Sequence, residues 1–359
     1  MNTIHKIILS AAQNMSNVTD NSVNLVVTSP PYPMIEMWDD VMGNQNSQIK
    51  EQLKTNPQKA FELMHSELDK VWEECFRVLE YGSFLCINIG DATRSINGSF
   101  ELYNNSSRIV SACKKIGFVN LPNVLWRKQT NSPNKFMGSG MLPNGAYVTL
   151  EHEWILIFRK GGKRVYTKEE DKKIRRSSSF FWEERNVWFS DLWEVKGTKQ
   201  LIGDSETRER NASYPFEIPY RLINMYSQKG DVVLDPFLGL GTTTLAAIIL
   251  QRNSIGYEID TKLSKAITAN IKRFYQAQPN QILQKRLKMH MHFIHERKES
   301  NKEVKYFNNN IQCPVMTNQE TDISFENLNT LKIEEKTNSI EILCEFAEKS
   351  IIYQPTTLL

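Results

Sequence analysis

Cysteine, net charge and long apolar runs are all scarce in this chain, and each scarcity excludes a class of protein. The 359 residues include five cysteines, with no C-x-x-C pair, which predicts reduced, mostly buried thiols and no disulfide framework. No run of eighteen apolar residues and no signal peptide occur, so we expect a cytoplasmic protein without membrane contact. A net charge of only +3 provides no global attraction for phosphate.

Histidine clustering is also weak as a metal signal. His290, His292 and His295 lie close together, but no acidic or cysteine ligands stand at fitting offsets. We therefore expect no metal site. The length is enough for about two domains on the usual scale of 100 to 200 residues each.

The run Thr28-Ser29-Pro30-Pro31-Tyr32 closes an apolar strand and is the most informative feature present. Its prolines fix φ near −65° and lack amide hydrogens, so the carbonyl groups around Ser29 and Pro30 stay free to accept hydrogen bonds from a ligand. An aromatic face and a small hydroxyl stand beside them. The pattern suits an exocyclic amino group, and the alternative is a strand followed by a rigid turn.

A second informative stretch begins at Asp231 and reads as strand, glycine loop and helix. Gly239 and Gly241 allow a sharp turn and close approach to a ligand, while Thr242 or Thr243 can cap the helix that follows. Glu258 ends the next strand, where an acid can accept both hydroxyls of a ribose. Thr244 stands where a dinucleotide fingerprint requires Gly or Ala, and no phosphate-loop Gly-Lys-Ser/Thr occurs.

Asp235-Pro236-Phe237-x-Gly239-x-Gly241-Thr242-Thr243 resembles the S-adenosylmethionine loop of DNA amino-methyltransferases, and Thr28 to Tyr32 resembles their catalytic motif. The resemblance covers roughly residues 1–275. It includes Gly82–Asp91, Val124–Lys128 and Glu151–Lys160, which are similar to the family's next strands. The catalytic motif precedes the cofactor motif, which is the order of the beta class. Together these features resemble an N4-cytosine enzyme of a restriction-modification system.

The resemblance implies a cofactor, S-adenosyl-L-methionine, and roles for particular residues. Ser29, Pro30, Pro31 and Tyr32 would be catalytic. The cofactor would contact Asp235, Pro236, Phe237, Gly239, Gly241, Thr242, Glu258 and Asp91. Relatives place Gly-Asp near the N-terminus, whereas this chain has Ile8 to Met15 there, so we expect Ser10 or a backbone carbonyl to hold the adenine amino group. Residues 211–219 resemble the segment that precedes the cofactor loop in this family, but they lack the histidine that relatives usually have before its first proline.

The target base depends on Ser29. Relatives with Asp or Asn at the first motif position generally methylate adenine N6, and those with Ser usually methylate cytosine N4. The absence of a Pro-Cys dipeptide removes the nucleophile needed for carbon-5 methylation. An N6-adenine enzyme, a non-catalytic DNA-binding module, a nicotinamide oxidoreductase and a methyltransferase for RNA or protein amides remain alternatives.

The expected partners are double-stranded DNA, a companion restriction endonuclease without necessary contact, and a second copy in a homodimer. Nine basic residues against three acidic ones between 159 and 176 favour a phosphate-contacting stripe, with a solvated face as the alternative. Its candidate DNA-binding residues are Lys163, Arg164, Lys172, Lys173, Arg175 and Arg176.

Periodicity predicts an α/β fold. Apolar residues at three- and four-residue steps indicate a helix over 57–80, and strands are expected at 23–28, 84–89, 122–127, 153–159, 231–235 and 254–258. The resemblance makes this a Rossmann-like methyltransferase fold, a mixed, mostly parallel sheet with helices on both faces and a smaller DNA-recognition region. We expect a catalytic half at 1–160, target recognition at 161–210, a cofactor half at 211–275 and an appended helical module at 276–359. Ile340, Leu343, Phe346, Ala347 and Ile351 suggest a last helix.

Overall fold

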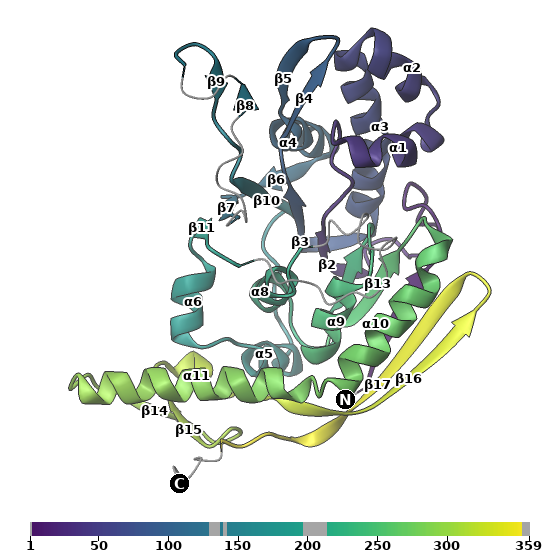
Figure 1. Ribbon diagram of the computed structural model, residues 1–359. Coiled ribbons are helices and arrows are strands. Elements are labelled where there is room, and N and C mark those ends of the chain that lie inside the picture. Colours follow the sequence, from purple (N-terminus) through teal and green to yellow (C-terminus); the bar gives the residue numbers. More distant parts are fainter. Residues whose placement is uncertain (1, 129–136, 139–141, 197–213, 354–359) are drawn as a thin grey trace.

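An eleven-stranded sheet organises the computed structural model, which describes residues 2–128, 137–138, 142–196 and 214–353 (Figure 1). In spatial order the strands are β11 (Leu192–Trp193), β7 (Val124–Arg127), β10 (His152–Lys160), β3 (Leu79–Ile89), β2 (Val23–Thr28), β12 (Val232–Asp235), β13 (Asn253–Tyr257), β1 (Asn2–Ile8), β17 (Ser339–Ser350) and β16 (Glu326–Lys336), while β6 (Phe118–Asn120) also pairs with β10.

The five central strands, from β3 to β1, run parallel to one another. β10 and β17 join this parallel centre antiparallel, one at each side. The expectation of a mixed, mostly parallel sheet is therefore confirmed, and all six predicted strands are present. The third strand begins earlier than expected, at Leu79, because the preceding helix ends at Val78.

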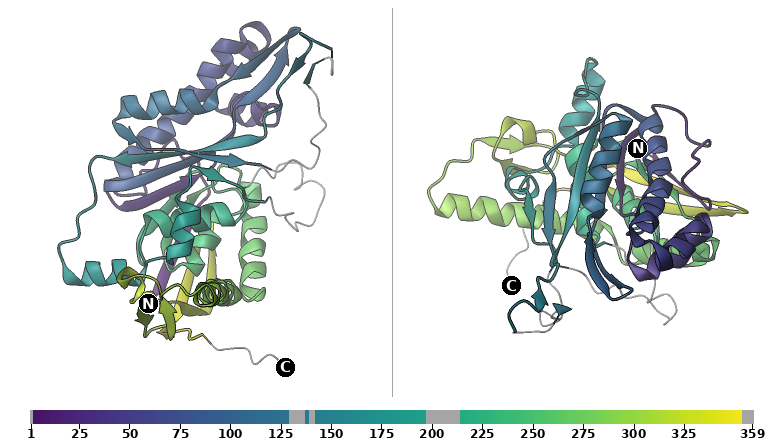
Figure 2. Two further views of the ribbon diagram at one scale, coloured as in Figure 1. Left: turned by 90° about the vertical axis from the view of Figure 1, so that its left-hand side faces the viewer. Right: turned by 90° about the horizontal axis from the view of Figure 1, so that it is seen from above.

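Helices cover both faces of the sheet, as expected (Figure 2). They are α1 (Asp39–Gln45), α2 (Gln48–Thr55), α3 (Pro57–Val78), α4 (Asn105–Ile116), α5 (Glu169–Ser177), α6 (Trp182–Trp188), α8 (Glu217–Tyr226), α9 (Thr242–Ile249), α10 (Ser264–Gln276) and α11 (Asn280–Glu299), with short 3-10 turns at Glu36–Trp38, Thr261–Leu263 and Asn318–Glu320. Two-stranded hairpins are β4 (Ala92–Ile96) with β5 (Ser99–Tyr103), β8 (Met137–Gly138) with β9 (Ala146–Tyr147), and β14 (Tyr306–Asn308) with β15 (Cys313–Val315).

The alternation of side chains along β2 divides the core between the two faces. Val26 packs in the cluster that contains the buried face of α3, whereas Leu25 and Val27 belong to the cluster that contains α8 and α9. α3 starts where Asn56 accepts a hydrogen bond from the Lys59 amide, with proline at the first helical position. All five cysteines are free and buried, as predicted. Among the described residues no helix has both the length and the hydropathy to span a bilayer.

The C-terminal segment differs from the prediction. The last helix expected over 340–351 is wrong, because this stretch is β17, which pairs with β1 and β16 and widens the main sheet. Its fully buried residues recur every second position, at Ile340, Ile342 and Cys344, which is the period of a strand. Among its described residues, the appended segment has one α-helix, α11, and a short 3-10 turn at Asn318–Glu320. Its strands β16 and β17 share a core with α9 and α10.

The segment proposed for target recognition and the appended segment pack on each other. The Phe181 ring stacks on His290 of α11 with centroids 3.8 Å apart. Glu184 of α6 accepts two hydrogen bonds from Arg286, at 2.6 and 2.7 Å, and Glu183 contacts His290 Nδ1 at 2.7 Å. These contacts join α6 and α11 in one layer, although the boundaries at 160, 210 and 275 remain predictions. Residues 197–210 lie outside the described part of the chain.

Candidate active site

The two sequence motifs meet at one edge of the sheet. β2 and β12 are parallel neighbours, so Ser29 and Pro236, which follow them, both leave the carboxyl edge. The Thr28 hydroxyl donates a hydrogen bond of 2.7 Å to Asp235 Oδ1 across this pair. Residues 207 positions apart in sequence therefore form a single site, as predicted.

Asp235 anchors the loop that follows it. Besides Thr28, its carboxylate accepts hydrogen bonds from the Phe237 amide at 3.1 Å and the Thr243 hydroxyl at 2.5 Å. Thr243 in turn lies 2.5 Å from the Tyr214 hydroxyl. Burial raises the pKa of Asp235 above its ordinary value, and the hydrogen bonds from these donors offset only part of that rise. The side chain holds β2, the loop and α9 together, and a direct contact with the cofactor remains a prediction.

Glycine shapes the loop between β12 and α9. Gly239 and Gly241 have φ of +55° and +84°, which glycine tolerates and residues with a side chain avoid. A Cβ atom added to Gly239 would meet nothing within 4 Å, so this backbone faces open space. Gly241 itself is the N-cap of α9, and the expectation that Thr242 or Thr243 caps the helix is wrong. The Thr243 side chain is turned to Asp235 instead.

Glu258 follows β13, at the same edge and next to this loop. Its two carboxylate oxygens accept hydrogen bonds from the amides of Gly239, at 2.9 Å, and Asp260, at 2.8 Å. Burial raises the pKa of Glu258 to about 7. Each oxygen retains a second lone pair, so the carboxylate can still accept two hydroxyl groups. These two acceptor oxygens and the open backbone at Gly239 fit the ribose of a nucleoside cofactor.

Two further residues predicted for the cofactor differ in their surroundings. Ser10 is exposed and follows the end of β1. The Glu258 amide donates to the carbonyl of Ile8, the last residue of β1, so Ser10 lies at the same edge of the sheet as Glu258. Asp91 instead uses both carboxylate oxygens on Ser106, accepting from its amide at 2.8 Å and its hydroxyl at 3.1 Å. It holds the first turn of α4, and the structure gives no support to a cofactor role for Asp91.

A polar network that the sequence reasoning missed surrounds the catalytic motif. Glu153 Oε2 accepts hydrogen bonds from the Tyr32 hydroxyl at 2.9 Å and from Asn88 Nδ2 at 2.7 Å, and Glu153 Oε1 pairs with Lys128. The Tyr32 hydroxyl lies 3.2 Å from Ser29 Oγ. Burial and then the charge of Glu153 raise the pKa of Tyr32 well above its ordinary value. The sequence signal that could have revealed this network is the polar Asn88, which stands between two isoleucines that are buried in the structure.

The basic run predicted to bind DNA begins at the opposite edge of the sheet. β10 is antiparallel to β3, so its last residue, Lys160, lies where β3 begins and donates to the carbonyl groups of Phe76 and Leu79. Arg164 donates two hydrogen bonds to Asp231, at 3.0 and 2.8 Å, just before β12. Arg164 is thus engaged within the fold through one guanidinium nitrogen, and a phosphate contact for it remains a prediction without structural support.

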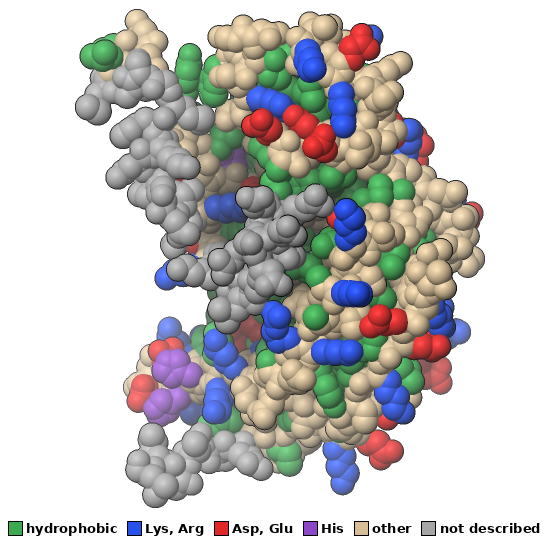
Figure 3. All heavy atoms as spheres, turned by 45° about the vertical axis from the view of Figure 1, so that its right-hand side comes forward, with side chains coloured by type: hydrophobic (Ala, Val, Ile, Leu, Met, Phe, Trp, Pro, Cys, Tyr) green, Lys and Arg blue, Asp and Glu red, His purple; other side chains and the backbone are tan. Residues whose placement is uncertain are grey.

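The other members of the run lie on or beside α5. Arg176 pairs with Asp322, Lys172 pairs with Glu169 at 2.6 Å, and Arg175 lies over the Tyr166 ring. Lys163 and Lys173 are exposed. On the face shown in Figure 3, Lys and Arg side chains are scattered and do not form one continuous patch. DNA binding by this run remains a prediction without structural support.

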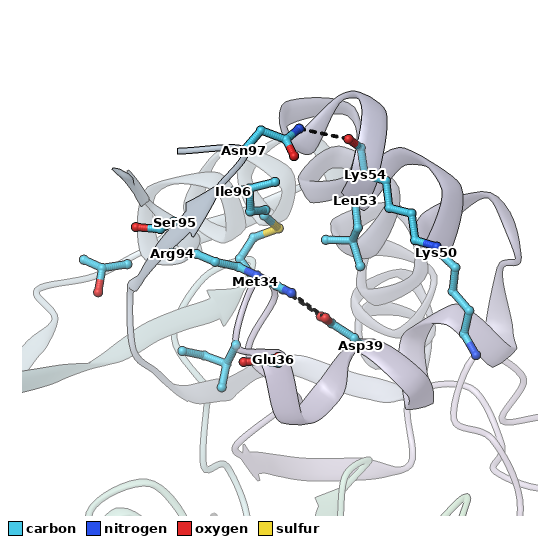
Figure 4. Close-up of a pocket in the computed structure, with 12 residues that line it drawn as sticks. Met34, Glu36, Asp39, Lys50, Leu53, Lys54, Arg94, Ser95, Ile96 and Asn97 are labelled. Atoms are coloured by element: carbon cyan, nitrogen blue, oxygen red, sulfur yellow. Dashed lines mark hydrogen bonds and ion pairs between the residues drawn. The ribbon is translucent and has the colours of Figure 1, made fainter. Parts of the chain in front are cut away.

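An open cavity of about 750 Å³ lies beside the Pro-Pro-Tyr turn (Figure 4). Met34 and Ile35, which follow the turn, form one side, and the β4 strand forms another. Arg94 of β4 donates to both carboxylate oxygens of Asp39, at 2.8 and 2.6 Å, and so joins β4 to α1. Among the described residues, no group of three or more His, Cys, Asp or Glu side chains could hold a metal ion.

Comparisons with known proteins agree with this geometry. The model of the N6_N4_Mtase family, described as DNA methylase, matches residues 23–270, more than half of the chain. The type II methyltransferase M.MthZI of Methanothermobacter thermautotrophicus is 49% identical over 326 residues, covering 90% of each chain. M.MjaI of Methanocaldococcus jannaschii, also a type II methyltransferase, is 51% identical over 281 residues, covering 75% of this chain and 91% of its own.

Solved structures share the fold. TTHA0409 of Thermus thermophilus, a putative DNA modification methylase solved with S-adenosyl-L-methionine, has a TM-score of 0.59 and 29% identity, and the match covers 75% of this chain and 93% of that one. The PvuII DNA methyltransferase, which is cytosine-N4-specific, has a TM-score of 0.51 at 15% identity over 74% of this chain and 85% of its own. At that identity the PvuII likeness supports the fold alone.

Proposed function

The chain belongs to the N6_N4_Mtase family of DNA methylases, and we propose that it transfers a methyl group from S-adenosyl-L-methionine to the exocyclic N4 of cytosine in double-stranded DNA. The family name covers both N6 and N4 methylation, so the base is the part that we infer. The observation that carries it is Ser29, a hydroxyl where N6 enzymes generally have a carboxylate or amide, beside the cofactor loop.

The chemistry requires that the base leave the duplex, because its amino nitrogen is otherwise inside the stack. Ser29 and the Pro30 carbonyl would accept the two hydrogens of the amino group, and the Tyr32 ring would lie against the base. The hydrogen bond from Tyr32 to Glu153 fixes that ring before the base arrives. Pro31 keeps the turn rigid. This arrangement positions the nitrogen before the reaction begins.

S-adenosyl-L-methionine supplies a methyl carbon bound to a positively charged sulfur. Glu258 would accept the ribose hydroxyls, and Gly239 would allow close approach of the backbone. The remaining proposed contacts are Pro236, Phe237, Gly241 and Thr242 in the loop, and Ser10 near the adenine. Asp235 would act mainly by holding the loop in place.

The duplex must approach the carboxyl edge, since Ser29 lies there. The cavity beside Met34 faces the same turn, and Lys50 and Lys54 contribute to its lining. Lys163, Lys172, Lys173 and Arg175 would contact DNA only if the duplex extended to the other edge. We expect that edge to lie roughly 20 Å away, which is the length of a six-residue strand.

The biological role follows from the relatives, which are type II methyltransferases. We infer that the protein protects host DNA in a cytoplasmic restriction-modification system, with a companion endonuclease that need not bind it. Assembly as a homodimer is a further proposal.

The decisive experiment identifies the modified base. Plasmid from cells that express the chain is digested to nucleosides and analysed by mass spectrometry, with Ser29→Ala as the matched control. We expect N4-methylcytosine with the wild-type chain and a loss of at least about a hundredfold with the variant. N6-methyladenine would overturn the choice of base, and plasmid without any modified base would overturn the function.

A further inference from the structure

The network behind Ser29 has a fixed hydrogen-bond direction. A carboxylate cannot donate, so the Tyr32 hydroxyl must give its only hydrogen to Glu153, 2.9 Å away. At the 3.2 Å contact between Tyr32 and Ser29, the Ser29 hydroxyl is then the donor. The lone pairs of Ser29 Oγ are consequently directed away from Tyr32. Asn88 Nδ2 lies 3.4 Å from this oxygen, and the other lone pair is left for an amino group to donate to.

From this geometry we propose that Glu153 is the terminal proton acceptor of a relay that runs from the target amino group through Ser29 and Tyr32. The inference rests on the function proposed above. Glu153 lies at the start of β10, and it acts on the substrate only through the two hydroxyls. It is therefore a positioning residue for Ser29 as well as the end of the relay.

For each methyl group that the base gains, the relay removes one proton from its amino nitrogen. The amino lone pair forms the new nitrogen–carbon bond, and the sulfur keeps the electrons of the bond that breaks. The nitrogen becomes cationic and gives a proton to Ser29 Oγ. Ser29 passes its own hydrogen to Tyr32, and Tyr32 passes its hydrogen to Glu153. The base is neutral at the end, and the carboxylate has gained one proton.

The surroundings of Glu153 suit this role. Glu153 is 8% exposed. Asn88 Nδ2 donates both to its Oε2 at 2.7 Å and to the Tyr32 hydroxyl at 2.8 Å, and so holds these two groups next to each other. Lys128 pairs with the other oxygen. The Lys128 side chain is 43% exposed, so it connects the buried pair to solvent.

A glutamine at position 153 would interrupt the relay, because it has one acceptor oxygen and cannot accept from Lys128 and from Tyr32 and Asn88 together. With that oxygen turned to Lys128, Tyr32 would donate to Ser29, and one of the lone pairs needed by the amino group would be occupied. With the oxygen turned to Tyr32 and Asn88, the hydrogen bonds would be kept, but the neutral amide could not take up the proton. Glu153→Gln keeps the volume of the side chain, so the cavity and the fold should remain.

The test measures single-turnover methyl transfer to unmethylated plasmid DNA with labelled S-adenosyl-L-methionine. We expect Glu153→Gln to slow transfer about a hundredfold, within the range for proton-transfer groups, while affinities for DNA and for S-adenosylhomocysteine stay within about twofold. Glu151→Gln, on the same segment but without a hydrogen bond to Tyr32 or Ser29, is the matched control and should keep the wild-type rate.

Two readouts separate a relay from a merely structural role. Tyr32→Phe keeps the ring and removes the middle hydroxyl, so Glu153→Gln should add less than about threefold to its effect. The pH profile of the rate should change shape in Glu153→Gln and not in Glu151→Gln. Lys128 and Tyr32 face Glu153, and Tyr214 also acts on Tyr32, so these groups contribute to that profile.

Additive effects of the two substitutions, or an unchanged rate in Glu153→Gln, would overturn the relay alone. So would a loss of rate that is fully matched by loss of DNA or cofactor affinity. An inactive wild-type chain would overturn the proposed function and the relay with it.

Discussion

Glu258 gives the sharpest test of the cofactor site, because its burial makes binding depend on pH. In the folded protein its pKa is about 7, against an ordinary value of 4.5. Ribose hydroxyls donate to the ionised carboxylate, so below pH 7 the cofactor must displace a proton in order to bind. We expect affinity to fall about fivefold between pH 7 and pH 6, with release of about half a proton per cofactor at pH 7 and close to one at pH 6.

Glu258→Gln removes this dependence. Each hydroxyl bonded to a carboxylate contributes about 1.5 kcal/mol, and glutamine keeps only one of the two acceptor oxygens, so affinity should fall at least about tenfold at pH 8. Titration calorimetry with S-adenosylhomocysteine, in buffers of different ionisation enthalpy, gives both the affinity and the proton count. Asp260→Asn is the matched control, since it removes a carboxylate two residues away and should change affinity less than about threefold.

The stability of the cofactor-free protein should change in the opposite direction. A folded-state pKa above the unfolded value means that stability is fully present below about pH 4.5 and is lost as pH rises through about 7. The wild-type melting temperature should therefore fall between pH 6 and pH 8 by more than that of Glu258→Gln. A cofactor affinity that is independent of pH in the wild type, or unchanged in the variant, would refute the ribose contact.

Three other substitutions test the fold around the site. Arg164→Gln leaves the buried Asp231 without its charged partner, so we expect urea unfolding to show about 2 kcal/mol less stability. DNA affinity, measured by fluorescence anisotropy, should not change. Weaker DNA binding without loss of stability would instead support a phosphate contact of Arg164. An asparagine at position 235 cannot accept all the hydrogen bonds that Thr28, Phe237 and Thr243 donate to Asp235. We expect Asp235→Asn to lower the free energy of unfolding by about 2 kcal/mol and to weaken cofactor binding. If urea unfolding and calorimetry show neither effect, Asp235 does not anchor the loop. Ile342→Asp places a charge at a fully buried position of β17 and should destabilise the protein by more than about 3 kcal/mol, whereas an unchanged melting temperature would show that this strand is not part of the core.

The parts of the site that could be predicted are local in sequence. Ser29, Asp235 and Glu258 each follow or end a short apolar strand, and strands separated by helices tend to run parallel. Parallel neighbours end at the same edge, so the meeting of the motifs followed from the strand pattern. The hydrogen bond from Thr28 to Asp235 confirms it.

The C-terminal hairpin could not be assigned from spacing alone. Ile340, Leu343 and Phe346 recur at three-residue steps, which favours a helix, although Ile340, Ile342 and Cys344 also alternate as in a strand. What decides between them is the free edge of β1, which needs a partner for its backbone groups. That edge belongs to the other end of the chain, beyond the reach of any local window.

The direction of β10 explains both the missed network and the distance of the basic run from Ser29. Had β10 run parallel to β3, Glu153 would lie at the amino edge and the basic run would emerge beside Ser29. Because it runs antiparallel, its first residues bring Glu153 to Asn88 and Tyr32, and its last residues carry Arg164 to Asp231 at the far edge. The apolar pattern of a buried strand is the same in either direction, so the sequence places β10 in the sheet without saying which end meets the substrate.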